Sequence, residues 1–455
     1  MRVAIIGCTH AGLSAAIQIL TEQPSAQVTV YERNDNVSFL SCGIALYLSQ
    51  QVAELQDMMY FSPEQLSELG ARVKIRHDVL KVNTKRKVLL CQDMTTKVIF
   101  QDHYDKLIIA TGSYVNVPPI IGVDDSRVLF CKGYEQAQRI KRQAEKSHTI
   151  AVIGGGYSGV EIAESFATTG HDVILIQGND QLLNNYVDPF LSQEVVTLLR
   201  EHQVKVLIND RVNAFISDGD QVGIQTQHEL LRADLAIVCT GFSANTELVS
   251  DTELVSDQVE VDRHDAIITN RYMQTSDPDV YAAGDACVTH YNPTNADAYI
   301  PLATNAVRSG ILAGHNVLGN RRQSMGTQAT AALKIFDYHI ATTGITLKNA
   351  QKINDHVASV CYQGNYRYSF MGTPTKITIV LVYDRQNREV LGAQLFSRHE
   401  IAQSANTISL AIQNHNTIDE LAFVDMLFNP NYDQAFNYLN LVAQLAIKQE
   451  QTPNK

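Results

Sequence analysis

Two stretches of this chain repeat one pattern: an apolar run, a glycine-rich turn and then a helical run. In the first, Arg2–Ile6 leads into Gly7-Cys-Thr-His-Ala-Gly12; in the second, Thr149–Ile153 leads into Gly154-Gly-Gly-Tyr-Ser-Gly159. A strand, a tight turn and a helix start in this order present backbone N–H groups to a pyrophosphate. The repeat therefore predicts two dinucleotide-binding units in one α/β chain, as in a flavin enzyme that also binds a nicotinamide.

The two turns differ in detail. The second has the full G-x-G-x-x-G spacing, whereas Thr9 replaces the middle glycine of the first. Glu32 follows the strand predicted at residues 27–31, where a carboxylate can accept hydrogen bonds from a ribose diol. Gln177 takes that place in the second unit, and a neutral amide does not repel a 2′-phosphate. Because no arginine follows within residues 178–185, we expect NADH to be preferred over NADPH, with weaker discrimination than an acidic residue would give.

Length, charge and cysteine usage narrow the possible functions. At 455 residues the chain is long enough for about two to four domains. A net charge of −12 disfavours nucleic acid and anionic membranes as partners. No basic and apolar leader and no apolar run of about 20 residues is visible, so we expect a cytoplasmic protein. The seven cysteines are scattered without Cys-x-x-Cys spacing, so neither a metal site nor a disulfide framework is predicted.

Cys42 is the thiol with the most informative surroundings. It lies within residues 37–48, before a glycine and an apolar helical pattern. A sulfur at a helix start feels the positive end of the helix dipole, which favours the thiolate. No other cysteine occurs between Cys8 and Cys91, so Cys42 has no resolving partner in its own segment. Beside a flavin such a thiol can cycle through sulfenic acid or a mixed disulfide; the alternative is a small buried hydrophobe.

The order of the segments indicates that the first unit is interrupted and later resumed. The strands predicted within residues 107–112 and 235–241 both end in Thr-Gly, where the chain would pass from one domain to another. Residues 275–285 then read as a turn and a short strand ending in Gly-Asp. Beyond about residue 323, the runs at 376–383 and 389–395 predict an antiparallel sheet, and helical patterns follow at 401–414 and 436–447.

The chain resembles the single-cysteine branch of the flavin-dependent pyridine nucleotide-disulfide reductases, and within it the bacterial NADH oxidases and NADH peroxidases. The coenzyme A-disulfide reductases are nearer cousins than glutathione reductase. The segments that carry the resemblance span nearly the whole chain in the family order: Gly7-Cys-Thr-His-Ala-Gly12, Ser38-Phe-Leu-Ser-Cys-Gly43, Gly154-Gly-Gly-Tyr-Ser-Gly-Val-Glu161, Ala282-Ala-Gly-Asp285, Tyr299-Ile-Pro-Leu-Ala-Thr-Asn305 and Asn429-Pro-Asn-Tyr-Asp433.

The resemblance implies an α/β fold with two Rossmann-like dinucleotide-binding domains, the NAD domain inserted in the FAD domain, and a C-terminal α+β dimerisation domain. The expected boundaries are 1–115 and 244–322 for the two parts of the FAD-binding domain, 116–243 for the NAD(P)H-binding domain and 323–455 for the dimerisation domain. The resemblance also implies FAD and NADH as cofactors and a homodimer or a dimer of dimers; the weaker use of NADPH follows from Gln177.

Roles for individual residues follow from the same resemblance. His10 would lie beside the flavin and the Cys42 sulfur, and these two would be the catalytic residues. Glu32 would hold the adenosine ribose, Val79 the adenine edge, and Tyr157 would cover the nicotinamide side of the flavin until NADH displaces it. The expected cofactor-binding residues are Gly7, Thr9, His10, Ala11, Gly12, Glu32, Cys42, Val79, Ala110, Thr111, Gly112, Ser113, Lys132, Gly154, Gly156, Tyr157, Ser158, Gly159, Glu161, Gln177, Tyr186, Gly241, Gly284, Asp285, Leu302 and Ala303.

The expected activity is the reduction of dioxygen to water at the expense of two NADH, with Cys42 alternating between thiolate and sulfenic acid and His10 assisting proton transfer. NADH peroxidase and coenzyme A-disulfide reductase are the alternatives that use the same parts. The second is weakened because Gly43-Ile-Ala-Leu-Tyr47 lacks the Pro-Tyr expected after the Cys-Gly of those enzymes. A flavin-binding redox sensor is the remaining alternative. Motif residues separate oxidase from peroxidase poorly, because oxygen access depends on channel geometry.

Overall fold

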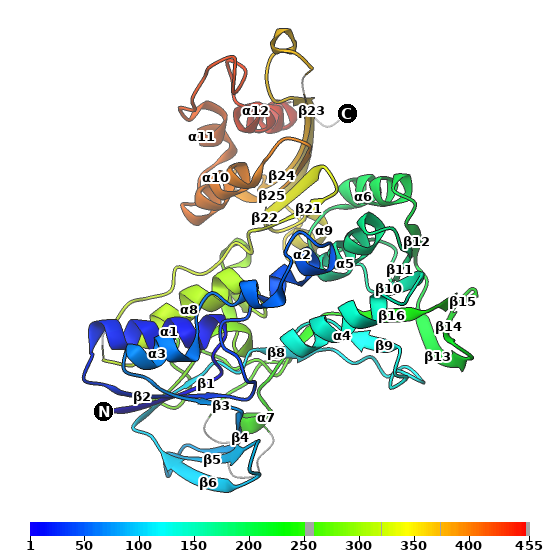
Figure 1. The fold of residues 1–455 in the computed structure, drawn as a ribbon. Helices are drawn as coiled ribbons and strands as arrows, with labels where there is room; N and C mark the ends of the chain where they lie inside the picture. The colour runs from blue at the N-terminus through cyan, green and yellow to red at the C-terminus, as the bar shows by residue number, and fades with distance from the viewer. Residues whose placement is uncertain (251–258, 320, 374, 452–455) are drawn as a thin grey trace.

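The computed structural model of the chain describes residues 1–250, 259–319, 321–373 and 375–451. Figure 1 shows two α/β units side by side and a third unit of strands and helices that projects from them. Within the described ranges, no helix combines the length and the apolar character that crossing a membrane requires.

The first α/β unit is a parallel five-stranded sheet in the order β18-β7-β1-β2-β3. Helices α1 and α8 pack against each other, and their apolar residues share a core with β1 and β2. Because β18 follows the second unit in the chain, the first unit is built from two separated stretches. Its elements are β1 (Arg2–Ile6), α1 (His10–Glu22), β2 (Gln27–Glu32), α3 (Pro63–Glu68), β3 (Arg72–Ile75), β7 (Lys106–Ile109), β18 (Val280–Ala282) and α8 (Ala303–Asn316).

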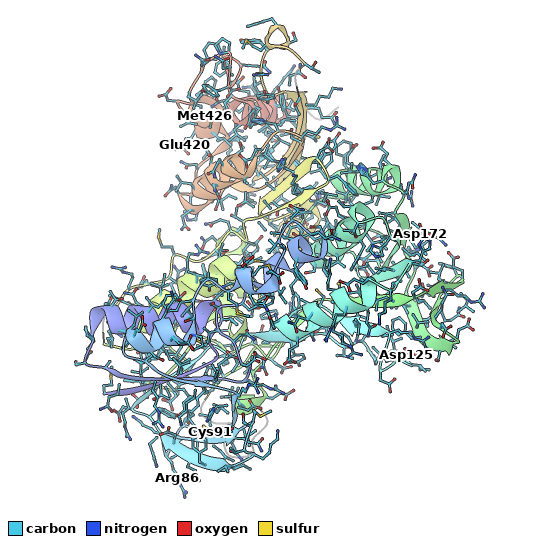
Figure 2. All side chains as sticks on the ribbon, in the orientation of Figure 1. Arg86, Cys91, Asp125, Asp172, Glu420 and Met426 are labelled. Atoms are coloured by element: carbon cyan, nitrogen blue, oxygen red, sulfur yellow. The ribbon has the colours of Figure 1, made fainter. Side chains whose placement is uncertain are left out.

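An antiparallel three-stranded sheet, β4-β5-β6, is appended to this unit, and sequence patterning did not predict it. Its strands are β4 (His77–Asn83), β5 (Val88–Asp93) and β6 (Ile99–His103). Cys91 lies in β5, at the opposite end of the first unit from α2, as Figures 1 and 2 show.

The second α/β unit repeats the architecture with the sheet order β12-β11-β10-β16-β9, again parallel throughout. A separate antiparallel sheet, β13-β14-β15, extends from it. The elements are β9 (Val128–Phe130), α4 (Tyr134–Ala144), β10 (Thr149–Ile153), α5 (Tyr157–Thr168), β11 (Asp172–Gln177), α6 (Pro189–Glu201), β12 (Lys205–Ile208), β13 (Val212–Asp218), β14 (Gln221–Thr226), β15 (Leu230–Ala233) and β16 (Leu235–Val238).

Short elements join the two units. Strand β8 (Ser113–Val115), on the way into the second unit, pairs antiparallel with β17 (Phe242–Ala244), on the way out. Helix α7 (Glu247–Ser250) and the hairpin β19 (Thr289–Tyr291) and β20 (Ala296–Ala298) complete the return.

The C-terminal unit is an antiparallel five-stranded sheet in the order β21-β22-β25-β24-β23, covered by helices. The expected antiparallel sheet and helices are therefore confirmed. The elements are β21 (Ala331–Ile335), β22 (Tyr338–Gly344), α9 (Leu347–Ala350), β23 (Val357–Asn365), β24 (Lys376–Asp384), β25 (Val390–Ser397), α10 (Ala402–Gln413), α11 (Ile418–Phe423) and α12 (Tyr438–Gln451).

The segment that carries Cys42 lies where the three units meet. Cys42 occupies a 3-10 turn, Ser41–Gly43, and the helix that follows it, α2 (Ile44–Leu48), has only five residues. Helix α2 packs against α5 of the second unit (Figure 1). Its buried residues belong to one apolar core with Phe166 of α5 and Leu333 of β21. A substitution in this core is therefore expected to alter the packing of all three units.

Candidate active site

The first glycine turn brings backbone groups together closely. Gly7 has φ +94°, and a Cβ there would overlap the carbonyl of Ala110 at the end of β7. A Cβ at Gly12 would overlap the carbonyl of Gly7. Within α1, whose residues are all described, no side-chain cap and no acidic residue occupies the first turn. The first N–H groups of α1 are thus available to an anion.

Glu32 anchors this turn from the end of β2. The carboxylate is buried, and it accepts the N–H of Cys8 at 2.7 Å and the N–H of Asn34 at 2.9 Å. Burial raises the pKa of Glu32, and the hydrogen bonds from Asn34 and Cys8 oppose that shift. Nδ2 of Asn34 donates to it as well, at 2.7 Å, so one of the carboxylate's about four lone-pair positions remains for a ribose hydroxyl.

Three residues predicted from distant segments form one polar cluster. Ser113 Oγ donates to Asp285 Oδ2 at 2.6 Å, and Lys132 Nζ donates to Ser113 Oγ at 2.7 Å. Lys132 also forms an ion pair with Asp285 at 3.7 Å. Sequence reasoning missed Phe242, whose ring lies under Lys132 Nζ at 4.1 Å. Burial lowers the pKa of Lys132, and the charge of Asp285 opposes this.

His10 meets a residue that sequence reasoning also missed, Tyr60. Nδ1 of His10 lies 2.8 Å from Oη of Tyr60, while Nε2 of His10 is buried without a hydrogen-bond partner among the described residues. Burial lowers the pKa of His10, with Asp285 raising it and Lys132 lowering it further. Burial also raises the pKa of Tyr60 to about 12, and the charges of Cys8 and Cys42 add to the shift. Tyr60 therefore links His10 to the surroundings of Cys42.

The electrostatics of Cys42 differ from the expected stabilised thiolate. Although the residue as a whole is exposed, partial burial of the thiol raises its pKa, and the charge of Glu161 raises it further. Burial of the thiol is the largest cause and the charge of Glu161 the second, and α2, with five residues after a 3-10 turn, carries too little dipole to oppose them. In the chain alone, Cys42 is therefore favoured as a thiol.

The second glycine turn repeats the geometry of the first. Gly154 has φ +110°, and a Cβ there would overlap the carbonyl of Cys239; a Cβ at Gly159 would overlap the carbonyl of Gly154. Gly156 has open space where its Cβ would lie. It precedes α5, whose described first turn, Tyr157 and Ser158 included, contains no acidic residue. This turn too can receive an anion.

Gln177 is the last residue of β11, and both the oxygen and the nitrogen of its side-chain amide form hydrogen bonds. Its Oε1 accepts the N–H of Gly155 at 3.0 Å, and its Nε2 donates to the carbonyl of Gln181 at 3.1 Å. The next residue, Gly178, lies against Arg211: a Cβ on Gly178 would stand 3.5 Å from Nε of Arg211. Arg211 lies between β12 and β13, outside residues 178–185, so sequence reasoning did not connect it with this place.

The nicotinamide residues implied by the resemblance lie on or near α5. The ring of Tyr157 stacks on Tyr186 with centroids 3.9 Å apart, and its hydroxyl lies 2.7 Å from Oγ1 of Thr342 in the C-terminal unit. Burial, with the charge of Glu164, raises the pKa of Glu161 to about 7. The charge of Glu161 in turn raises the pKa of the Cys42 thiol.

The remaining predicted residues fall into two groups. Most line the first unit: Thr111 Oγ1 donates to the carbonyl of Asn245, Gly284 abuts Ala11, and Leu302 and Ala303 begin α8; Gly112 and Gly241 occupy positive-φ positions at the crossings between units. Val79 is the exception. Its side chain is buried in the core around β4, so only its backbone remains for an adenine edge.

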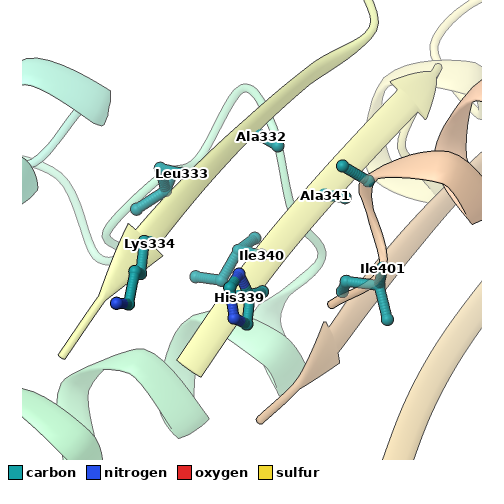
Figure 3. A pocket seen from close by; sticks show the side chains of 8 residues that line it. Ala332, Leu333, Lys334, His339, Ile340, Ala341 and Ile401 are labelled. Atoms are coloured by element: carbon teal, nitrogen blue, oxygen red, sulfur yellow. The ribbon is translucent and has the colours of Figure 1, made fainter. Parts of the chain in front are cut away.

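Two surface cavities lie outside the predicted set. One, of about 170 Å³, is lined mainly by β21, β22 and the start of α10, with Lys334 and His339 at its polar side (Figure 3). The other, of about 300 Å³, is lined by residues 35–37, 59–63 and 65, and it includes Tyr60. Only the second touches the residues around His10.

The residues of the first unit fit FAD. The two glycines close the turn, the start of α1 is open to a pyrophosphate, and Glu32 stands at the ribose position. Two buried polar atoms, Nε2 of His10 and Oη of Tyr299, lack hydrogen-bond partners among the described residues. The charge of Asp285 raises the pKa of both His10 and Tyr299. Such orphaned atoms are what a bound polar ring system would satisfy.

Comparison with known proteins identifies the family. The pyridine nucleotide-disulphide oxidoreductase profile matches residues 1–310, and the dimerisation-domain profile of the same family matches residues 330–439. An NADH oxidase of Enterococcus faecalis is 42% identical over 450 residues, which cover 98% of this chain and 100% of that protein.

Solved structures agree with the sequence comparison. The water-forming NADH oxidase of Lactobacillus brevis, bound to NADH, superposes with a TM-score of 0.96 at 44% identity and 99% coverage of both chains. An engineered water-forming NADPH oxidase derived from it, bound to NADPH, gives the same values. Two profile matches that together span most of the chain, with relatives of equal length, establish that this chain belongs to the pyridine nucleotide-disulphide oxidoreductase family.

Proposed function

We propose that this protein is an FAD-dependent, water-forming NADH oxidase in which Cys42 alternates between thiolate and sulfenic acid. The observation that carries the proposal is one exposed thiol, Cys42, in a segment bonded to the first glycine turn: the N–H of Ser38 donates to the carbonyl of Cys8 at 2.9 Å. The thiol is thereby tied to the FAD-type turn while α2 packs on the second, NAD-type unit. The similarity to two NADH oxidases supports the choice of donor and acceptor.

The proposed division of labour follows the site. When bound, FAD supplies the two-electron relay between the nicotinamide and the acceptor. The second turn, from Gly154 to Gly159, holds the pyrophosphate of NADH, and Tyr157 moves aside to admit the nicotinamide. Glu32, Asp285 and Lys132 hold the flavin nucleotide by its ribose and ribitol.

The chemistry at sulfur balances over two NADH. Electrons from the first NADH reduce dioxygen to hydrogen peroxide. The Cys42 thiolate attacks one peroxide oxygen, the O–O bond breaks, and the leaving oxygen takes a proton through His10 to depart as water. Electrons from the second NADH reduce the sulfenic acid to the thiolate, and its oxygen leaves as the second water.

The test is oxygen consumption with NADH, followed with and without catalase. Wild-type protein is expected to show no oxygen return on adding catalase, because its product is water. Cys42→Ser is expected to return half of the consumed oxygen, because it stops at peroxide. Cys361→Ser, which removes the other exposed thiol among the described residues, is the matched control and is expected to behave as wild type.

Three outcomes would overturn the proposal. Peroxide release by the wild-type protein would show that its product is not water. Reduction of added peroxide without any oxygen consumption would make the protein an NADH peroxidase, and turnover only with coenzyme A disulfide would make it a disulfide reductase.

The proposed assembly is a homodimer formed through the C-terminal unit. The dimerisation-domain profile covers that unit, and large apolar side chains on it are left in solvent: Phe423 is 71% exposed, Leu427 69% and Tyr432 69%. Sedimentation analysis of the wild-type protein and of Phe423→Ser tests this: a monomeric wild-type protein would contradict it.

A further inference from the structure

We propose that Tyr60 is a positioning residue for His10: its hydroxyl donates to Nδ1, so that Nε2 carries the proton and presents it toward the reacting atoms at Cys42. The inference deepens the proposed function and rests on it. It assigns a role to a side chain that no sequence motif marks.

Tyr60 contacts His10 directly, and its backbone runs beside the segment that carries Cys42. Its Oη lies 2.8 Å from Nδ1 of His10, and the planes of the two rings are within 10° of each other. Its hydroxyl is also close enough to Cys42 and Cys8 for their charges to raise its pKa. On its other side, Tyr60 lines the cavity of about 300 Å³ and is 50% exposed. Tyr60 thus stands between a solvent-facing cavity and the imidazole.

The backbone on which Tyr60 is carried is fastened to the Cys42 segment. Phe39 and Met59 form an antiparallel bridge, and the N–H of Leu40 donates to the carbonyl of Met58 at 3.0 Å. On the far side of Tyr60, Ser38 Oγ accepts the N–H of Phe61 at 2.9 Å and donates to its carbonyl at 2.7 Å. The backbone of Tyr60 is therefore held from both sides against the segment that carries the thiol, and the contact with His10 orients its hydroxyl.

The direction of the hydrogen bond follows from donor and acceptor strength. A phenol is a better donor than the N–H of neutral imidazole, and an imidazole nitrogen is a better acceptor than a phenol oxygen. Burial keeps His10 neutral by lowering its pKa and keeps Tyr60 protonated by raising its pKa. The bond that Oη makes to Nδ1 therefore leaves the proton of the imidazole on Nε2, the atom that has no partner among the described residues.

The direct test is the tautomer of His10 in the FAD-loaded protein, read from the ¹⁵N shifts of labelled histidine and assigned by difference with His10→Gln. We expect a protonated Nε2 and a hydrogen-bonded, unprotonated Nδ1 in the wild-type protein, and a mixture of tautomers in Tyr60→Phe. A proton on Nδ1 of wild-type His10 would overturn the proposal.

Turnover gives the second readout. Tyr60→Phe is expected to lower kcat about fivefold with an unchanged KM for NADH, and to release part of the oxygen as peroxide. Tyr47→Phe is the matched control, since Tyr47 lies on α2, the helix that follows the same thiol, and is not among the residues assigned to the site. Tyr60→Phe behaving as Tyr47→Phe in kcat and peroxide release would overturn the proposal. If the wild-type protein released peroxide, the proposed water-forming function would be contradicted, and the tautomer of His10 would still decide the role of Tyr60.

A second inference rests on a different place, the end of β11. We propose that Arg211 is the residue that lets the site accept the 2′-phosphate of NADPH. Arg211 is exposed and lies against Gly178, with its Nε, Cβ and Cα all within 3.8 Å of where a Cβ of Gly178 would stand. Gly178 follows Gln177, the residue expected at the adenosine ribose, so Arg211 is a cation that could pair with a phosphate on the 2′-oxygen of a bound coenzyme.

The test compares kcat/KM for the two coenzymes. Arg211→Ala is expected to lower the value for NADPH about tenfold and that for NADH less than twofold, because only NADPH carries the phosphate. Arg211→Lys should retain part of the NADPH activity, and Arg142→Ala, which removes an exposed cation from α4 of the same unit, should change neither value. Equal loss with both coenzymes, or no loss with NADPH, would overturn this inference.

Discussion

In the first nucleotide unit the N–H of Cys8 donates to the carboxylate of Glu32, and in the second the N–H of Gly155 donates to the amide of Gln177. The two contacts hold equivalent turns to equivalent strands. The other hydrogen bonds of the two side chains differ. The carboxylate of Glu32 also accepts two hydrogen bonds from Asn34, whereas the amide nitrogen of Gln177 donates to the carbonyl of Gln181. One backbone frame thus carries a negative charge at one ribose position and a neutral amide at the other.

Comparing the two units separates the residues that the turn itself requires from those that vary with the bound nucleotide. The positive-φ glycines and the glycines one turn into each helix meet carbonyls in both units, so they are requirements of the turn. The middle position is Thr9 in one turn and Gly156 in the other, and the ribose position also varies, so these are free to differ with the nucleotide bound.

The largest expected effect tests the shared frame. Gly7→Ala and Gly154→Ala each place a methyl against a carbonyl at positive φ, so each should lower the free energy of unfolding by about 3 kcal/mol or more. Urea unfolding measures this. Gly170→Ala, with φ +87° but open space around it, is the control and should lose only about 1 kcal/mol. Equal losses at all three positions would show that the carbonyl contacts do not matter.

The next effect concerns carboxylates in the two units. The pKa of Glu161 is raised from 4.5 to about 7, so as pH rises through this window the unfolded chain loses its proton first and stability falls; below pH 4.5 there is no difference. Glu161→Gln should therefore be more stable than the wild-type protein by roughly 2 kcal/mol at pH 8 and equal to it at pH 4. Urea midpoints at both pH values check this, and a pH-independent difference would contradict it. Glu32→Gln should show a smaller pH dependence, since hydrogen bonds oppose the effect of burial there.

Exchanging the two ribose residues sharpens the comparison. Glu32→Gln is expected to weaken FAD retention about tenfold, because an amide cannot accept all the donors that the carboxylate accepts. Gln177→Glu is expected to lower kcat/KM for NADPH about tenfold relative to NADH, because the carboxylate repels the 2′-phosphate. FAD titration of the apoprotein and coenzyme kinetics are the measurements. A wild-type preference for NADPH would refute the expectation that NADH is the favoured donor.

The smallest effect tests the middle position of the second turn. Gly156→Thr copies Thr9 of the first turn into a place with open space and φ −77°. The free energy of unfolding should change by less than about 0.5 kcal/mol. The KM for NADH should rise about threefold, because the side chain keeps the backbone from the pyrophosphate. If the variant did not fold, the turn would require glycine at this position, contrary to the prediction.

The repeated frame was predictable from sequence because each of its parts is local. An apolar run, a positive-φ glycine and a helical pattern lie within about twenty residues, and the strands Arg2–Ile6 and Thr149–Ile153 have the predicted bounds. The helices begin at His10 and Tyr157, inside the two glycine turns, because the last residues of each turn already belong to the helix.

What sequence reasoning missed came from distant segments. Tyr60 reaches His10 across fifty positions, and Arg211 reaches Gly178 through the strand β12. The thiolate expected at Cys42 stays a prediction: the apolar pattern indicated a helix but not its shortness, and the charge of Glu161, which raises the pKa of the thiol, comes from another unit. Contacts between residues far apart in the sequence are set by tertiary packing, so no local sequence pattern predicts them.

The most direct test of the account is to trap Cys42 during turnover. With NADH and oxygen present, a probe specific for sulfenic acids, followed by peptide mass spectrometry, should label Cys42 and no other cysteine, and the labelled protein should release peroxide. Continued water formation with an unlabelled Cys42 would contradict the account.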